Sequence, residues 1–252
     1  MKNILISICI PTYEMHGGAL KMLTRSFDML KKQTFKDFEV VISDNSEDDV
    51  VKNLCASPAY QSLNINYFKN PRKGISKNTN EAIKMARGKI IKILHMDDYL
   101  ADENSMQDIL DNFKGNWLVT GCGHDMGDGR IINTHFPRYN QKIYIGKNTI
   151  GSPSVLSIKN ENPLMFDENL IWMNDCGYYE ELYEKYGEPD ILNKVNVVIG
   201  LGKHQTTSNI SNELKKREKA YMKEKYKDRK NYLNAFSKLW QGIITSIKNM
   251  FS

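Results

Sequence analysis

The sequence lacks closely spaced cysteines and long apolar runs, and each absence excludes a class of protein. It has no CxxC pair, and its four cysteines are scattered along 252 residues, at Cys9, Cys55, Cys122 and Cys176. This spacing argues against a disulfide framework or a zinc site and favours reduced thiols in a cytosolic protein. No stretch approaches the roughly 18 apolar residues that a helix needs to span a bilayer. The apolar start is short, rich in β-branched residues and stopped by Pro11, so it predicts a first strand rather than a signal peptide.

The composition is that of a globular chain, but its charge is unevenly placed. Hydrophobic residues make up 40% and charged residues 26% of the sequence, which is enough to bury a core. The length suits one large α/β domain or a domain with an appendage. The net charge of +5 is concentrated in the basic stretch between Glu213 and Lys230. Such a stretch attracts nucleic acid or anionic lipid, or serves neither purpose.

The first hundred residues alternate between strand and helix patterns. Apolar runs predict strands at residues 4–10, 38–43, 64–68 and 89–94. Helices are predicted between them, with apolar residues on one face, over residues 17–32, 48–55 and 74–87. This alternation is typical of βαβ units with right-handed crossovers, which predicts an α/β fold with a mostly parallel sheet.

Polar clusters follow three of these strands. They are Thr12-Tyr13-Glu14, Ser43-Asp44-Asn45 and His95-Met96-Asp97-Asp98. Because ligands of open α/β sheets bind at the carboxyl ends of the strands, we expect all three clusters to line one crevice.

The second half has a weaker pattern. It predicts helices at 105–113 and 175–186, strands at 117–121, 154–158 and 191–199, and a hairpin that turns at 127–129 and reaches Ile145. From Asn212 onward the pattern is helical to the end of the chain.

Carboxylates at the ends of buried strands have a chemical and a structural interpretation. Asp97 and Asp98 are suited to Mg²⁺ or Mn²⁺, because hard cations take carboxylate and phosphate oxygens together. Alternatively they form a turn or helix cap for the next segment. Asp44 is placed to accept from a ribose hydroxyl or a base N–H, or else to make an Asx-turn.

Four ordered motifs resemble family 2 glycosyltransferases, which have the Rossmann-like GT-A fold. They are SICIPTY at 7–13, FEVVISDNS at 38–46, NPRKGISKNTN at 70–80 and LHMDD at 94–98. The resemblance implies inverting transfer of a sugar from a nucleotide-diphosphate sugar to an acceptor hydroxyl. It implies donor-binding roles for Pro11, Thr12, Tyr13, Glu14, Asp44, Asn45, Lys73, Gly74, Asn78, His95, Met96, Asp97 and Ser152.

The LHMDD segment lies where the family carries its DxD motif. The family often has aspartate at the first position of that motif, and this chain has His95. The last aspartate of the motif is the usual metal ligand, which corresponds to Asp97. We therefore expect Mn²⁺ or Mg²⁺ to be held by Asp97 and Asp98, with His204 completing the shell or acting as a structural histidine.

A later segment, IWMNDCGYY at 171–179, resembles the part of the family that supplies the catalytic base. Asp175 matches the base, although Asn174 and Asp175 would also suit the N-cap of the next helix. Trp172 and Asn174 are expected on the acceptor side, where aromatic rings pack on sugar faces; a lone tryptophan in the core is the alternative.

The carboxyl-terminal region predicts an appendage. We expect a catalytic domain at 1–210, with a nucleotide-sugar half at about 1–100 and an acceptor half at about 101–210, followed by a basic helical extension at 211–252. Apolar residues recur at helical spacing in 231–251. That helix would bind a membrane surface, a second subunit in a homodimer, or its own core.

These features favour a cytoplasmic, hexosyltransferase-like enzyme, peripheral at the inner face of the cell membrane. Its acceptor would be a glycan or lipid-linked glycan of bacterial surface polysaccharide, such as O-antigen or capsule. The alternatives are a sugar-phosphate nucleotidyltransferase, a nucleic-acid-binding protein and a phage DNA-glycosylating enzyme. A nucleotidyltransferase would carry a Gly-rich basic signature near its first strand, where this chain has Pro11-Thr12-Tyr13-Glu14. Acidic residues interleaved in the basic stretch argue against nucleic acid as a partner.

Overall fold

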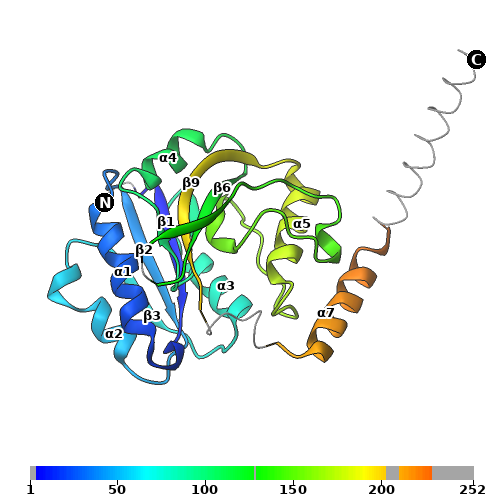
Figure 1. The fold of residues 1–252 in the computed structure, drawn as a ribbon. Helices are drawn as coiled ribbons and strands as arrows, with labels where there is room; N and C mark the ends of the chain where they lie inside the picture. The colour runs from blue at the N-terminus through cyan, green and yellow to red at the C-terminus, as the bar shows by residue number, and fades with distance from the viewer. Residues whose placement is uncertain (1–3, 128, 203–209, 229–252) are drawn as a thin grey trace, which may run out of the picture.

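The computed structural model describes residues 4–127, 129–202 and 210–228. Its first half is a parallel sheet of the predicted strands, which are β1 (Ile6–Thr12), β2 (Phe38–Asp44), β3 (Ile65–Lys69) and β4 (Ile90–Ile93). The order in the sheet is β3-β2-β1-β4, so the chain reverses its direction of winding at β1 (Figure 1). Every residue of β1 and β2 is buried, as expected for central parallel strands.

The predicted helices of this half are also present. They are α1 (Ala19–Lys32), α2 (Val50–Cys55) and α3 (Ile75–Met85). The Leu23, Phe27 and Leu30 side chains of α1 are fully buried in the core, which explains the helical spacing of these residues. Short 3₁₀ turns at Met15–Gly17 and Pro58–Tyr60 complete the connections.

The second half turns the sheet into a mixed one. Its strands are β5 (Tyr99–Leu100), β6 (Trp117–Asp125), β7 (Ile131–His135), β8 (Leu156–Lys159) and β9 (Asp190–Gly200). β8 pairs antiparallel with both β4 and β6, whereas β6 and β9 are parallel. The α/β fold class is confirmed, and the antiparallel pairs lie in the half where the sequence pattern was weak.

Two predicted boundaries were wrong. The hairpin of β6 and β7 ends at His135, and Ile143–Ile145 is a separate 3₁₀ turn. The strand predicted from Ser154 begins later, because Ser154 belongs to a 3₁₀ turn at Pro153–Val155. Ser152 caps this turn, and its hydroxyl accepts from the Ser154 backbone N–H. The strand begins only after this turn.

Three further helices surround this half: α4 (Ser105–Asn112), α5 (Asn174–Tyr186) and α7 (Asn212–Lys225) (Figure 1). α7 is the start of the predicted extension, and its Met222 belongs to the same hydrophobic core as the sheet. The amphipathic segment 231–251 lies outside the described residues. Among the described helices, none has the length and apolar character that crossing a membrane requires.

Candidate active site

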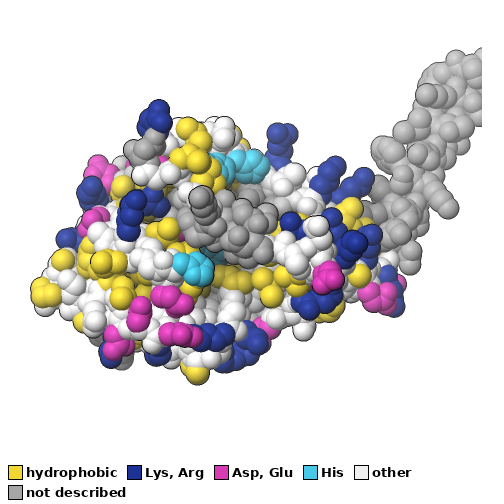
Figure 2. All heavy atoms as spheres, turned by 60° about the horizontal axis from the view of Figure 1, so that its bottom comes forward, with side chains coloured by type: hydrophobic (Ala, Val, Ile, Leu, Met, Phe, Trp, Pro, Cys, Tyr) yellow, Lys and Arg dark blue, Asp and Glu magenta, His cyan; other side chains and the backbone are white. Residues whose placement is uncertain are grey.

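A cavity of about 800 Å³ lies at the carboxyl ends of the strands. Figure 2 views the molecule from this side. The cavity is lined by Pro11, Tyr13, Glu14, Met15, Asn45, Glu47, Lys73, Gly74, Ile75, Asn78, His95, Met96, Asp97, Asp98, Ser152, Pro153, Ile171, Trp172, Asn174, Asp175 and Ile199. The structure therefore brings together most of the predicted donor and acceptor residues. Thr12 and Asp44 are not among the lining residues.

Asp97 and Asp98 differ in their surroundings. Asp97 is half-buried at the cavity wall. Asp98 is 2% exposed, and its carboxylate accepts a hydrogen bond from the Gly200 backbone N–H at 2.9 Å. Burial and the neighbouring charge of Asp97 raise the pKa of Asp98 well above its usual range. Asp98 thus ties β9 to the LHMDD segment.

Gly200 is required at this junction. A Cβ atom on Gly200 would lie 2.3 Å from the Asp97 carbonyl oxygen, which is closer than any side chain allows. The backbone of β9 therefore approaches the LHMDD segment only because residue 200 has no side chain.

A buried network supports the same segment from the other side. Ser154 Oγ accepts from the His95 backbone N–H at 2.8 Å, and the Ser154 carbonyl accepts from the Lys92 ammonium. Lys92 is fully buried, and burial lowers its pKa to about 7. Burial also lowers the pKa of His95, which favours the neutral imidazole expected at a phosphate or nucleoside contact.

The cavity offers carboxylate oxygen to a divalent cation whose other ligands would come from a diphosphate and water. The described residues contain no group of three or more His, Cys, Asp and Glu side chains that could hold a metal ion. Mg²⁺ sites of this kind use one or two carboxylates and complete their shell with phosphate oxygens and water. Asp97, at the cavity wall, suits that role, and a ligand role for Asp98 stays a prediction. His204 lies outside the described residues.

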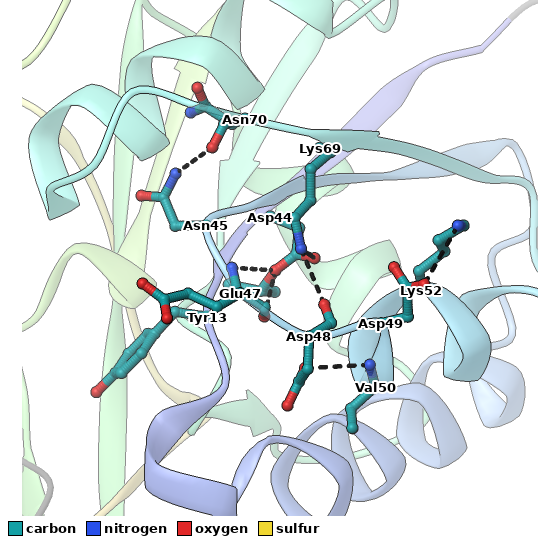
Figure 3. Close-up of polar contacts among 12 residues, drawn as sticks. Tyr13, Asp44, Asn45, Glu47, Asp48, Asp49, Val50, Lys52, Lys69 and Asn70 are labelled. Atoms are coloured by element: carbon teal, nitrogen blue, oxygen red, sulfur yellow. Dashed lines mark hydrogen bonds and ion pairs between the residues drawn. The ribbon is translucent and has the colours of Figure 1, made fainter.

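Asp44 is fully buried, and protein groups surround its carboxylate (Figure 3). One oxygen accepts from the Ser46 backbone N–H at 2.9 Å and from the Thr12 hydroxyl at 3.2 Å. The other accepts from the Tyr67 hydroxyl at 2.9 Å and lies 3.5 Å from the Lys69 ammonium. The contact with the Ser46 backbone N–H is that of the Asx-turn alternative. The expected contact of Asp44 and Thr12 with a nucleoside stays a prediction.

The segment from Asn70 to Asn78 is held by side-chain amides. Asn78 donates to the Thr12 carbonyl at 2.9 Å and accepts from the Ser43 hydroxyl at 2.6 Å. Asn45 donates to the Asn70 carbonyl at 2.8 Å, and Figure 3 shows the two side by side. Gly74 precedes α3 with φ of 117°, a conformation that glycine adopts without strain. The Gly-then-Asn pattern thus shapes one wall of the cavity.

Asp175 lies in the first turn of α5, on the same cavity. Its carboxylate accepts from the Asn148 amide at 2.7 Å and from the Cys176 backbone N–H at 2.6 Å. Burial raises the pKa of Asp175, and these hydrogen bonds oppose the rise. The N-cap of α5 is Met173, which makes no side-chain cap bond. The N-cap interpretation of Asp175 and of Asn174 was therefore wrong.

Trp172 and Asn174 line the cavity beside Asp175. The backbone before α5 is held by the Glu218 carboxylate of α7, which accepts from the N–H groups of Ile171, Trp172 and Met173 at 2.8, 2.9 and 2.9 Å. α7 therefore positions the loop that carries these residues.

Comparison with known proteins identifies the family. The model of the family described as "Glycosyl transferase family 2" matches residues 7–159, more than half of the chain. The protein belongs to glycosyl transferase family 2.

Relatives of this family 2 protein include named enzymes. "GalNAc(5)-diNAcBac-PP-undecaprenol beta-1,3-glucosyltransferase" of Campylobacter jejuni is 27% identical over 97 residues, which are 38% of this chain and 30% of that protein. The chain spans about a third or less of the length of the curated relatives it matches: 28%, 30%, 20%, 33% and 33%.

Solved structures share the fold. S. aureus TarS 1-349 in complex with UDP-GlcNAc has a TM-score of 0.65 at 21% identity, covering 82% of this chain and 61% of that one. The mannosyltransferase PcManGT from Pyrobaculum calidifontis, in complex with GDP-Man and Mn²⁺, has a TM-score of 0.55 at 15% identity, covering 78% and 56%. These similarities confirm the GT-A fold.

Sequence patterns missed two residues that support the site of this family 2 protein. Asn148 orients Asp175, as described above. Arg25 of α1 donates to the Asp97 carbonyl at 2.6 Å and pairs with the buried Asp125 at 2.9 Å. In the sequence both residues stand alone, far from their partners, and neither belongs to a motif.

Replacing Arg25 with methionine is expected to weaken nucleotide binding about tenfold, because a charged hydrogen bond to the Asp97 backbone contributes roughly 1.5–3 kcal/mol. Calorimetric titration with UDP and GDP would measure the change. Lys21→Met, at an exposed position of the same helix, is the control. Wild-type affinity in a folded Arg25→Met variant would show that this contact does not support the site.

Proposed function

We propose that the protein transfers a sugar from a nucleoside-diphosphate sugar to a hydroxyl of a glycan or lipid-linked glycan, with inversion at the anomeric carbon. The observation that carries the proposal is that Asp97 and Asp175 line one cavity at the switch point of a family 2 fold. We expect the enzyme to act in the cytoplasm, at the inner face of the membrane, in surface polysaccharide synthesis.

Each end of the cavity has a separate chemical task. At the donor end, Asp97 would hold Mn²⁺ or Mg²⁺, which supplies positive charge for the departing diphosphate. The named structural relative with GDP-Man and Mn²⁺ supports this choice of cofactor. Tyr13 and Lys73 line the same end, where a ring and a cation are suited to a nucleobase and a phosphate.

At the acceptor end, Asp175 would act as general base. Its carboxylate takes the proton of the acceptor hydroxyl while that oxygen attacks the anomeric carbon. The bond between that carbon and the diphosphate oxygen breaks, and the nucleoside diphosphate leaves with the electron pair. Direct attack from the opposite face inverts the configuration. Asn148 keeps the carboxylate in place through its 2.7 Å hydrogen bond.

A screen of donor hydrolysis tests the proposal. The purified protein is incubated with UDP-, GDP-, ADP- and dTDP-sugars, with Mn²⁺ or with EDTA, and released nucleoside diphosphate is measured. We expect release from one donor class, lost with EDTA. The proposed activity is wrong if the folded protein neither binds nor hydrolyses any of these donors.

A further inference from the structure

Two lysines of α7 flank the tryptophan at the acceptor end of the cavity. The Lys215 and Lys219 ammonium nitrogens lie 5.7 and 5.4 Å from the centre of the Trp172 ring. Being four residues apart, they lie on one face of the helix. Trp172 itself lines the cavity. The acceptor end of the cavity therefore carries an aromatic ring with two positive charges over it.

The position of these lysines is fixed by a buried anchor. Glu218, between them in sequence, is 1% exposed. Its carboxylate is engaged by the three backbone N–H groups of the loop that carries Trp172. One turn further along, Met222 is fully buried in the core. α7 is therefore docked on the acceptor loop, and the two lysines are held beside Trp172 rather than projecting from a free tail.

Lys215 and Lys219 differ in their pairing from Lys225 of the same helix. Lys225 pairs with Asp167 and Glu181, each at 2.7 Å. Across the part of the chain that the structure describes, no carboxylate lies in ion-pair range of Lys215 or Lys219. Figure 2 shows Lys and Arg side chains gathered on the side where α7 lies. Two unpaired cations beside an open cavity attract a negatively charged group.

We propose that Lys215 and Lys219, with Trp172, form an anion subsite that selects an acceptor glycan carrying a phosphate or carboxylate next to the sugar that is modified. The lysines contact the anionic group, and the part of the Trp172 ring that they leave uncovered packs against the sugar. The inference rests on the proposed glycosyltransferase activity and names the class of its acceptor.

Binding of short probes tests the subsite. In a Trp240→Phe background, the remaining tryptophans are Trp172 and Trp117, which is 1% exposed, so quenching reports on Trp172. The probes are trigalacturonate for carboxylate, a glycerol-phosphate trimer for phosphate and maltotriose as the neutral trimer. The variants are Lys215→Gln/Lys219→Gln and the matched Lys216→Gln/Lys223→Gln, which removes two exposed cations of the same helix.

We expect at least one anionic probe to bind about fivefold more tightly than maltotriose, and to lose that advantage only in the Lys215→Gln/Lys219→Gln protein, with the loss shrinking at high salt. Which anionic probe binds distinguishes carboxylate from phosphate acceptors. Equal binding of all three probes, or equal loss in the matched control, overturns the subsite. Thermal melting of each variant verifies that it is folded. Absence of donor hydrolysis by the wild type, with anion selectivity intact, would count against the proposed function and not against the subsite.

Discussion

Replacing Asp97 with alanine is expected to abolish metal-dependent nucleotide binding, with a loss of affinity of at least about 100-fold in the presence of Mn²⁺. Asp97 is the half-buried carboxylate at the cavity wall. Its neighbour Asp98 is buried and accepts from the Gly200 backbone N–H at 2.9 Å, so we expect Asp97 to be the main ligand. A hard cation would thus lose its main protein ligand, and the diphosphate would lose the charge that offsets its own.

Calorimetric titration of UDP and GDP, each with Mn²⁺ and with EDTA, measures this effect. Wild-type protein should bind its preferred nucleotide much more tightly with Mn²⁺, and Asp97→Ala should bind equally weakly in both buffers. Glu103→Ala removes an exposed carboxylate elsewhere and serves as the control. If the Asp97→Ala protein kept the Mn²⁺-dependent gain in affinity, another group would have to hold the metal.

The nucleotide half of the fold was predictable because its signals are local. Buried parallel strands have continuous apolar runs, and the polar clusters lie directly after them in the sequence. β1, β2 and β4 place Tyr13, Asn45 and Asp97 at one edge, so those residues meet in one cavity. The place of these residues at that edge follows from topology.

The remaining features depend on contacts between distant segments. Arg25 acts on Asp97, and Glu218 acts on the loop before α5. Neither pairing leaves a pattern in a short window of sequence. Asp44 shows the opposite case: its place at a strand end was right, but its carboxylate turns to Tyr67 and Lys69 instead of lining the cavity. Which way a polar side chain points is decided by the partners that the fold brings to it.

Replacing Asp175 with asparagine should leave donor binding intact and lower sugar transfer by about 10²–10⁴-fold, the usual contribution of a general base. Asparagine has nearly the same shape, but it cannot take a proton at neutral pH. Nucleotide titration and transfer assays on the same preparation separate the two effects. Asn148→Ala tests positioning, because it removes the 2.7 Å hydrogen bond to Asp175. Transfer by this variant should fall less than in Asp175→Asn, and its pH profile should shift.

The pH profile of transfer distinguishes a base from a residue that only shapes the pocket. The active form of Asp175 is the ionised carboxylate, so transfer should fall as the pH drops through its pKa. Burial raises that pKa, so the fall in transfer should begin at a higher pH than for an ordinary aspartate, whose pKa is about 3.9. The Asn148 amide stabilises the ionised form, so Asn148→Ala should move the fall to higher pH. The residual transfer by Asp175→Asn should not show this fall at low pH. A wild-type rate and profile in Asp175→Asn would place the base elsewhere.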